Sequence, residues 1–324
     1  MIELKNINKT FKAARRNAGL SEAVKALFKK EYTYIHALND VSFTINDGEM
    51  VGYIGPNGAG KSSTIKIMSG ILTPDSGECI INGRTPWKDR IAHVREIGVV
   101  FGQRSQLWWD VPVADSFELI KEIYKVDNAT FNKNLNELTE LLDIGEIMRT
   151  PARQLSLGQR MRCEIAASLL HSPRILFLDE PTIGLDAVSK IAIRSFIKTI
   201  NKERKTTVIL TTHDMQDIEA LTERILLIGR GKILLDGTLS QLKKKNSTRK
   251  TLSVDFLGKI SEVSHGMSIS KMMDGHAEIV VETDIISVSE ALSIISNQVE
   301  ISDLSVTGTT TEELVVSLYR EFEI

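Results

Sequence analysis

The sequence has no long apolar run, little cysteine and almost no net charge, and each of these gaps excludes a class of protein. Its 324 residues contain no stretch close to the ~18 apolar residues that a membrane-spanning helix needs. The two cysteines, Cys79 and Cys163, show no metal-ligand spacing, so we expect them to be reduced and structural. The net charge of −2, from 40 Lys and Arg against 42 Asp and Glu, argues against a protein held on nucleic acid by bulk electrostatics.

The amino-terminal residues also lack a targeting signal. The stretch MIELKNINKTF alternates like a β-strand and has no apolar segment of the kind found in signal peptides. We therefore expect a soluble cytosolic protein whose membrane role comes through a partner at the cytoplasmic face. Charged residues make up 25% and hydrophobic ones 42%, an ordinary balance for a globular chain. The length suits one large domain and a smaller one.

Apolar strands alternate with helical patterns along the first two thirds of the chain. This order predicts an α/β domain over residues 1–242, with a parallel sheet covered on both faces. Helical periodicity dominates residues 104–171, which we interpret as a helical subdomain. Residues 187–203 are predicted to form another helix. The predicted strands are 1–11, 37–45, 50–55, 97–102, 174–179 and 206–212.

Two segments interrupt or end this domain. Residues 12–36 form a basic insertion between the first two strands. One helical face of it carries the apolar residues Leu20, Val24, Leu27 and Phe28, which predicts a short amphipathic helix. Near 243–250 the texture becomes polar and charged, which indicates a linker. Residues 251–324 then combine strand-like and helical stretches in an order that suits a small α+β domain, of the ferredoxin-like type.

The stretch GPNGAGKSS, residues 55–63, has the spacing of a phosphate-binding loop between a strand and a helix. Glycines let the backbone close on a phosphate, and the amides of residues 57–63, with the helix N-terminus, favour an anion. We predict that Lys61 reaches the β- and γ-phosphates and that Ser62 offers its hydroxyl oxygen to Mg²⁺. The predicted ATP-binding residues of this loop are Gly55, Pro56, Asn57, Gly58, Ala59, Gly60, Lys61, Ser62 and Ser63.

Polar side chains end three further strands at the sheet's carboxyl edge, where ligands bind in such sheets. The strand RILFLDEP delivers Asp179, which suits a Mg²⁺ ligand, and Glu180, which suits a general base for an attacking water. His213 follows TTVILTT and is a candidate contact to the γ-phosphate or the water. Gln103 follows IGVVFG and is a candidate Mg²⁺ ligand. Glu180, His213 and Gln103 are the predicted catalytic residues, although a structural role is an equal alternative for the last two.

The order of these motifs resembles that of ATP-binding subunits of ABC transporters. The set GPNGAGKSS, Gln103, LSLGQ, ILFLDEP, GLD and His213 carries the resemblance over about residues 1–240. The stretches LWWD and SLGQRMRCEIAASLLHSPRILFLDEPTIGLD resemble those of ABC-2-type export systems. The resemblance implies a P-loop NTPase fold with a parallel-sheet core, an antiparallel β subdomain and a helical subdomain, and ATP and Mg²⁺ as cofactors. The carboxyl-terminal domain resembles, more weakly, the small appendage of drug-exporter ATPases.

The same resemblance implies that two copies pair head to tail around two ATPs. The signature loop LSLGQ of one copy would then cover the γ-phosphate held by the other. Ser156, Gly158 and Gln159, with Asp186 of GLD, are the residues expected to act on the partner's nucleotide. The helix after LSLGQ would add its N-terminal dipole to that anion.

The sequence departs from the family pattern in two places. The commoner signature is L-S-G-G-Q, and here Leu157 replaces the first glycine. If that position needs φ > 0, leucine would be strained. The aromatic ring expected to stack on adenine is assigned to Phe11, with Tyr34 as a competitor because the insertion blurs the alignment.

Trp108 and Trp109 lie shortly after Gln103, in a region that borders the permease groove in the resembling family. Core packing and anchoring of a permease helix are equal alternatives for this pair. For the basic insertion, a solvated decoration is favoured over contact with anionic lipid or with a permease.

The sequence therefore predicts the ATP-hydrolysing subunit of an exporter, working on separate transmembrane permease subunits and binding no nucleic acid. An importer ATPase is the first alternative. A soluble ABC ATPase acting on DNA or ribosomes is the second, disfavoured because the chain has one cassette and no inserted coiled coil.

Overall fold

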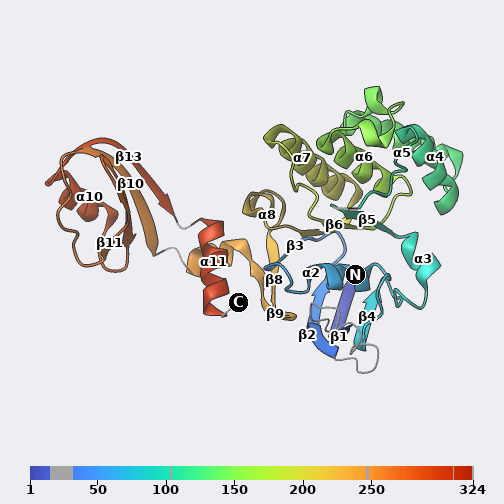
Figure 1. Ribbon diagram of the computed structural model, residues 1–324, viewed down its shortest axis with the longest axis horizontal. Helices are drawn as coiled ribbons and strands as arrows, with labels where there is room; N and C mark the ends of the chain where they lie inside the picture. Colours follow the sequence, from blue (N-terminus) through green and yellow to red (C-terminus); the bar gives the residue numbers. More distant parts are fainter. Residues whose placement is uncertain (15–31, 103, 246–247, 309, 323–324) are drawn as a thin grey trace, which may run out of the picture. The chain divides into compact units, whose positions relative to one another are not determined.

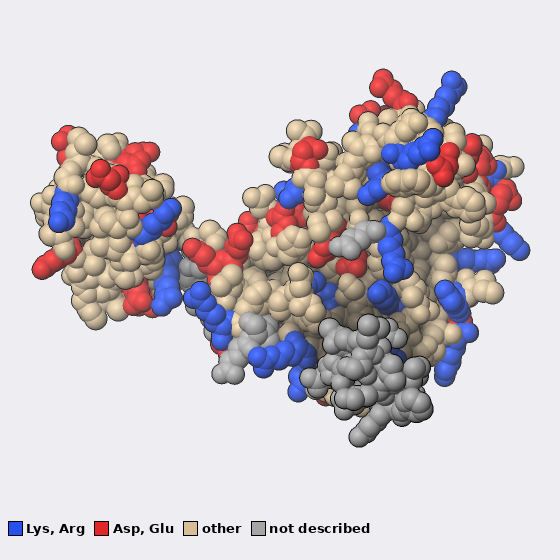
Figure 2. All heavy atoms as spheres, viewed as in Figure 1, with Lys and Arg blue, Asp and Glu red and all other residues tan. Residues whose placement is uncertain are grey.

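The computed structural model describes residues 1–14, 32–102, 104–245, 248–308 and 310–322. The chain forms two compact units, Met1–Asp236 and Gly237–Glu323. None of the described helices is both long enough and apolar enough to cross a bilayer. Figure 2 shows Lys and Arg interspersed with Asp and Glu over the visible face, in keeping with the small net charge.

The centre of the first unit is a six-stranded sheet in the order β5-β6-β7-β3-β8-β9 (Figure 1). The pairs β5–β6, β6–β7, β7–β3 and β3–β8 are parallel. Every residue of β7 is buried, as are four of the five in β6, because helices and a second sheet cover both faces. The strands are β3 (Met50–Ile54), β5 (Ile97–Phe101), β6 (Ile175–Asp179), β7 (Thr207–Thr211), β8 (Arg224–Gly229) and β9 (Lys232–Thr238).

A second, antiparallel sheet has the order β2-β1-β4, with β1 (Ile2–Ala14), β2 (Tyr32–Ile45) and β4 (Ser76–Ile81). Side chains from both sheets and from α2 (Lys61–Met68) share one apolar core, to which Ile2, Ile65 and Phe177 belong. α2 therefore packs between the two sheets, and this packing fixes the position of its N-terminus.

The remaining helices of this unit lie along or beyond the six-stranded sheet. Residues 104–171 contain α4, α5 and α6, as the periodicity predicted. The predicted helix 187–203 is α7, which extends by one residue to Arg204. The helices are α3 (Arg90–Val94), α4 (Val113–Tyr124), α5 (Asn128–Leu141), α6 (Leu157–Leu169), α7 (Ala187–Arg204) and α8 (Met215–Leu221).

The structure changes the interpretation of both interrupting segments. β1 and β2 extend the hairpin to residues 14 and 32, so both ends of the 12–36 insertion are strand rather than helix. The predicted amphipathic helix falls on residues 15–31, which lie outside the described residues. The predicted linker 243–250 is also partly regular, because α9 (Leu239–Lys245) ends within it and β10 (Arg249–Leu257) begins within it.

The second unit contains a four-stranded antiparallel sheet in the order β11-β12-β10-β13. Counted along the chain, this is the order of a ferredoxin-like sheet, but residues 258–266 connect the first two strands without the helix that this fold places there. One face packs on α10 (Val288–Ser296) through a core that includes Leu252, Ile279 and Ile295. The other elements are β11 (Met267–Met273), β12 (His276–Glu282), β13 (Glu300–Gly308) and α11 (Thr311–Glu321).

Both cysteines are buried and unpaired, Cys79 in β4 and Cys163 in α6. Burial raises the pKa of each thiol to about 12. They are structural residues, as their number and spacing predicted.

Candidate functional site

The phosphate loop predicted from GPNGAGKSS joins β3 to α2, and space and backbone angle both require its glycines (Figure 1). Gly58 and Gly60 have φ of +81° and +118°, which side chains rarely tolerate. A Cβ on Gly55 would lie 2.2 Å from the carbonyl oxygen of Ile228, and one on Gly60 2.7 Å from that of Ala37. The loop is therefore a tight backbone turn that leaves its amides free of side-chain bulk.

Lys61 begins α2, and its side chain folds back into the loop. Its Nζ donates to the carbonyl oxygens of Gly55 at 2.5 Å and Pro56 at 3.1 Å. The residue is buried, and this burial lowers the pKa of Lys61, while the carboxylates of Glu180 and Asp179 oppose the shift. Among the described residues this ammonium is hydrogen-bonded only to carbonyl oxygens, which it is well placed to exchange for a stronger anionic partner.

The first turn of α2 completes the anion cradle. Its N-cap, Gly60, makes no side-chain capping bond, so no side chain of the loop occupies the first amides of the helix. Thr64 anchors the turn, donating to the Gly60 carbonyl at 3.1 Å and lying 3.0 Å from the hydroxyl of Tyr53. Burial raises the pKa of Tyr53, which therefore stays neutral and purely structural.

The β6 carboxylate predicted to bind Mg²⁺ lies directly beside this turn. The hydroxyl of Ser62 donates to Asp179 Oδ2 at 3.2 Å. Thr211, paired with Asp179 across β6 and β7, donates its hydroxyl to Oδ1. Among the described residues no group of three His, Cys, Asp or Glu could hold an ion by itself. A hydroxyl and a carboxylate suit Mg²⁺, which takes one or two protein oxygens together with substrate phosphates.

The predicted base and its neighbour follow the same sheet edge. Glu180 adopts φ +56°, and its amide donates to the carbonyl oxygen of Thr211 at 2.9 Å. His213 Nδ1 lies 3.4 Å from Glu180 Oε1. The Glu180 side chain is 22% exposed and that of His213 63%, so the pair faces open space at the edge of the sheet. The structure thus brings Lys61, Ser62, Asp179, Glu180 and His213 to one edge, as predicted.

The sequence reasoning missed the groups that hold His213 in place. Asp217 is fully buried and accepts from Arg194 Nε at 2.5 Å and from the hydroxyl of Thr212 at 3.2 Å. Asp214 caps α8 and pairs with Lys190 at 2.6 Å. These bonds tie the segment around His213 to α7. The available signal was the cluster of hydroxyls and carboxylates directly after the apolar strand.

The signature loop LSLGQ forms the start of α6. Ser156 is the N-cap and forms a capping box with Gln159: its hydroxyl accepts from the Gln159 amide, and Gln159 Oε1 accepts from the Ser156 amide at 2.9 Å. Leu157 is the first helical residue and is not among those with positive φ, so the strain considered for this position does not arise. Its side chain is 37% exposed.

Gly158 and Asp186 are adjacent through Ser189. A Cβ on Gly158 would lie 2.5 Å from Ser189 Oγ. Asp186 caps α7, accepting from the Ser189 amide at 2.9 Å and its hydroxyl at 2.8 Å, and these bonds lower the pKa of Asp186. α6 and α2 lie on opposite faces of the six-stranded sheet (Figure 1). Within the described chain no hydrogen bond or ion pair joins residues 156–159 to residues 55–63.

The adenine-stacking prediction stays a prediction. Phe11 lies on β1 opposite Ile35 and is 40% exposed, with Lys9 Nζ 5.9 Å from its ring centre. Tyr34, on β2, is 59% exposed. Both rings are accessible to a ligand. Gln103 lies outside the described residues.

Trp108 and Trp109 are 57% and 51% exposed, so the core-packing alternative is wrong. Their backbone is nevertheless fixed. The Trp108 amide donates to Ser116 Oγ at 3.1 Å, and the Trp109 carbonyl accepts from the Arg153 amide at 3.0 Å. Two large apolar side chains held outward on a fixed backbone are typical of an interaction surface.

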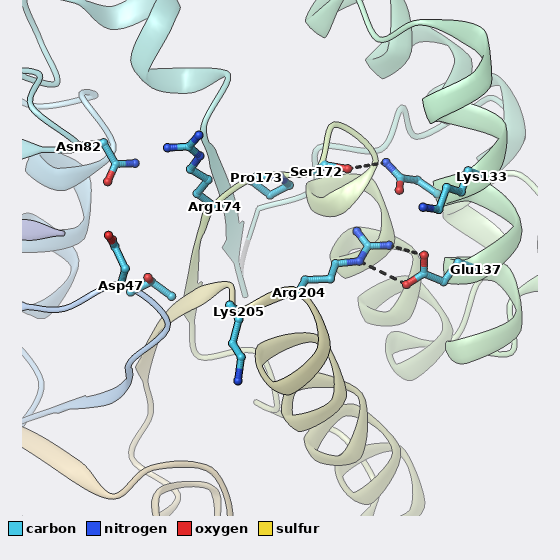
Figure 3. A pocket seen from close by; sticks show the side chains of 11 residues that line it. Asp47, Asn82, Lys133, Glu137, Ser172, Pro173, Arg174, Arg204 and Lys205 are labelled. Atoms are coloured by element: carbon cyan, nitrogen blue, oxygen red, sulfur yellow. Dashed lines mark hydrogen bonds and ion pairs between the residues drawn. The ribbon is translucent and has the colours of Figure 1, made fainter.

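A separate pocket of 490 Å³ opens at the other edge of the sheet, where β6 and β7 begin (Figure 3). Two links cross it: Arg204 pairs with Glu137 at 2.8 Å, and Asn134 donates to Ser172 at 2.8 Å. None of the predicted site residues lines it. This pocket is thus separate from the candidate site.

Comparison with known proteins agrees with this geometry. The ABC transporter family pattern matches residues 38–183. The "Probable sulfate/thiosulfate import ATP-binding protein CysA" of Chlorella vulgaris is 32% identical over 71% of this chain and 95% of its own length. "Linearmycin resistance ATP-binding protein LnrL" of Bacillus subtilis is 33% identical over 66% of this chain and 68% of its own length. "ABC transporter A family member 8" of Dictyostelium discoideum is 34% identical, but this chain spans only 27% of it.

A solved structure extends the similarity to the fold. An ATP-binding cassette, determined as a dimer in a post-hydrolysis state with ADP and Pi, superposes with a TM-score of 0.62 at 27% identity. The match covers 74% of this chain and 99% of that one. The carboxyl-edge residues fit ATP and Mg²⁺, and the chain belongs to the ABC transporter family, of which it carries the ATP-hydrolysing cassette.

Proposed function

We propose that this chain is the ATPase subunit of an ABC-2-type exporter, acting at the cytoplasmic face of the membrane on separate permease subunits. The observation that carries the proposal is the separation of the site into two halves. The phosphate loop and the catalytic carboxylates share one edge of the sheet, whereas the signature helix α6 begins on the other face. A second copy would supply the missing half of each site.

In this proposal the chain's own residues divide the work. Lys61 and the amides of the phosphate loop bind the β- and γ-phosphates, and Ser62 and Asp179 hold Mg²⁺, which neutralises phosphate charge. Glu180 accepts a proton from the attacking water, and His213, 3.4 Å away, orients that carboxylate. Ser156 and Gly158 of the partner close over the γ-phosphate. ATP supplies work because it binds the closed dimer better than the open one.

The exposed tryptophans are the surface through which the chain would act on the permease. β5 ends at Phe101, at the sheet edge that carries the nucleotide site. Only residues 102–107 separate that end from Trp108 and Trp109. We assign to this pair the anchoring of a cytoplasmic permease helix. The relative named for linearmycin resistance supports export, since resistance implies removal of a compound.

Import is the second candidate, because the similarity to the protein named for sulfate/thiosulfate import is of the same degree. The test is affinity purification of the tagged chain from detergent-solubilised membranes, followed by mass spectrometry. We expect stoichiometric multi-span permeases. A co-purifying solute-binding protein would favour import, and only soluble partners across several mild detergents would contradict both.

A matched pair of variants sharpens this test. Trp108→Ala with Trp109→Ala is expected to lower permease recovery about tenfold or more, as loss of central aromatic anchors does. The control is Ile91→Ala, which removes a 79% exposed side chain from α3. Equal recovery of permease with both variants would remove the tryptophans from the docking surface.

A further inference from the structure

Glu164 is a buried carboxylate that the proposed reaction does not use. It lies on α6, eight residues and about 12 Å along the helix from Ser156. Only 4% of the residue is exposed, and it makes no salt bridge among the described residues. Acidic residues are almost never buried to this extent without a specific partner. Its surroundings therefore need a specific explanation.

The partners of Glu164 belong to one short segment. Ser105 donates its hydroxyl to Oε1, and the Gln106 amide donates to Oε2 at 3.0 Å. The Gln106 side chain returns a bond to the Glu164 carbonyl at 3.0 Å. Ser105 Oγ also accepts from the Leu107 amide at 3.1 Å. Residues 105–107 are thus fastened to α6 at a single residue, through the carboxylate and the backbone carbonyl of Glu164.

This segment leads directly into the exposed tryptophans. We call residues 105–109 the tryptophan loop. Besides the bonds to Glu164, the loop backbone makes two further bonds. Trp108 bonds to Ser116 at the start of α4, and Trp109 bonds to Arg153 in the turn before α6. All three attachments lie in residues 113–164, and so in the helical segment that also carries Ser156 and Gly158. The signature and the tryptophans are therefore mounted on the same helices.

Retaining a carboxylate here has a cost that apolar packing would avoid. Replacing a buried charged group with an apolar one of similar size is often neutral or stabilising, whereas unpairing it is costly. Burial raises the pKa of Glu164, and the bonds from Ser105 and Gln106 oppose that shift. The cost of burying a carboxylate at residue 164 is explained if Glu164 serves to hold residues 105–107 and not to fill the core.

We propose that Glu164 is a positioning residue that makes the tryptophan loop move with α6, so that a nucleotide bound by the partner copy sets the orientation of Trp108 and Trp109. The inference rests on the proposed function, because it needs α6 to meet the partner's nucleotide. It adds the physical connection: from Ser156 along two turns of α6 to Glu164, and from there through Ser105 and Gln106 to the docking surface.

The experiment uses the full chain carrying Glu180→Gln, to retain ATP, and Trp87→Phe, to leave Trp108 and Trp109 as its only tryptophans, which are excited selectively over the tyrosines. Light scattering follows dimer formation on adding MgATP, and tryptophan emission follows the loop. In this parent we expect a dimer and a shift in emission. In Glu164→Ala we expect the same dimer, with the ATP midpoint within about threefold, but at least a threefold smaller emission shift.

Two further variants separate positioning from folding. Glu164→Gln should recover part of the shift, because its amide oxygen still accepts from the Gln106 amide. Ser105→Ala removes one of the bonds to Glu164 from the loop side without altering α6, and should also reduce the shift, by less than Glu164→Ala does. Hydrogen exchange at the Gln106 amide is expected to accelerate about tenfold or more in Glu164→Ala.

The outcomes are distinct. A dimer without an emission shift in the parent, or a full shift in both Glu164→Ala and Ser105→Ala, overturns the connection while leaving the ATPase proposal intact. Failure of the parent to dimerise with ATP instead overturns the head-to-tail proposal, and the inference with it.

Discussion

The phosphate loop and the signature loop each lead into the N-terminus of a helix, yet they are built in opposite ways. In the phosphate loop, glycines at positive φ leave the first amides of α2 without a side-chain cap, and Lys61 turns inward to donate to two backbone carbonyls. In the signature loop, Ser156 and Gln159 satisfy each other in a capping box. One loop is open to a ligand, and the other is closed on itself.

The difference indicates which loop binds first. An uncapped N-terminus and a buried cation gain most from phosphate, so the phosphate loop should take up ATP in the single chain. In the proposed dimer the signature loop would exchange the capping bonds of Ser156 for a partner's phosphate, and would gain only when that phosphate is already fixed. For the proposed dimer, the local geometry of the two helix ends therefore predicts that nucleotide binds before the two copies pair.

The strongest way to break the comparison is to remove the inward cation. Lys61→Ala is expected to lower ATP turnover about a thousandfold and to weaken nucleotide binding, because the loop loses its only buried positive charge. The measurement is phosphate release together with binding of a fluorescent ATP analogue. Lys66→Ala, five residues further along α2, is the control and should behave like the parent.

Removing the base separates binding from chemistry on the phosphate-loop side. Glu180→Gln should reduce turnover about a hundredfold or more while retaining ATP and trapping the dimer. Single-turnover hydrolysis and light scattering measure the two effects. Turnover equal to the parent's would exclude Glu180 as the base and leave His213 as the nearest alternative.

Crowding the signature loop tests the other half alone. Gly158→Ala places a Cβ 2.5 Å from Ser189 Oγ, so that hydroxyl must leave its bond to Asp186 or the helices must move apart. We expect ATP-driven dimerisation to weaken about tenfold, with ATP binding by the single chain unchanged. Ser189→Ala added to Gly158→Ala should restore part of the loss. If Gly158→Ala also weakens binding by the monomer, the two loops are not independent.

The smallest expected effect is on stability and lies beside the signature helix. Burial lowers the pKa of His171, in the turn after α6, to about 4, and its ring stacks on Tyr124 at 4.0 Å. The folded state disfavours the charged ring, so the pKa of His171 is higher in the unfolded chain. The free energy of unfolding is therefore unaffected by this ring above pH 6.5, the ordinary pKa, and decreases as pH falls from 6.5 toward 4.

His171→Phe removes the titration but keeps the stacking. We expect its unfolding free energy to fall less between pH 6.5 and 4 than the parent's, by at most about 1.4 kcal/mol per pH unit. Urea unfolding across that range measures the difference. Parallel pH profiles for the two proteins would show that the ring is already solvated in the native state.

Local chemistry decided which parts of the site the sequence predicted. The phosphate loop, Asp179 and Glu180 were found because each lies directly after an apolar strand, and one motif fixes the spacing. Thr211 and Glu164 were missed because their roles depend on partners 32 and 59 residues away, across paired strands and packed helices. Nothing local distinguishes them from ordinary strand and helix residues.

The same reasoning applies to the fold. The buried parallel strands were predicted from their apolar runs, whereas the edge strand β11 was missed. Six of its seven residues are exposed, so it shows no alternation. The strands β8 and β4 were also missed. β8 is apolar in the sequence but was not assigned as a strand, and β4 is short with only two buried residues. Trp108 and Trp109 are held outward by bonds to Ser116 in α4 and to Arg153 before α6. These contacts cannot be inferred from the spacing of residues in the sequence.

The two buried cysteines have a practical consequence. A thiol with a pKa of about 12 is ionised in roughly one molecule in 10⁵ at neutral pH, so Cys79 and Cys163 should be inert to maleimides and disulfide exchange in the folded chain. A single cysteine introduced at an exposed position, such as Ile91→Cys, would then be the sole labelling point of an otherwise native sequence. Spin labels or dyes can therefore be placed without first removing the natural thiols.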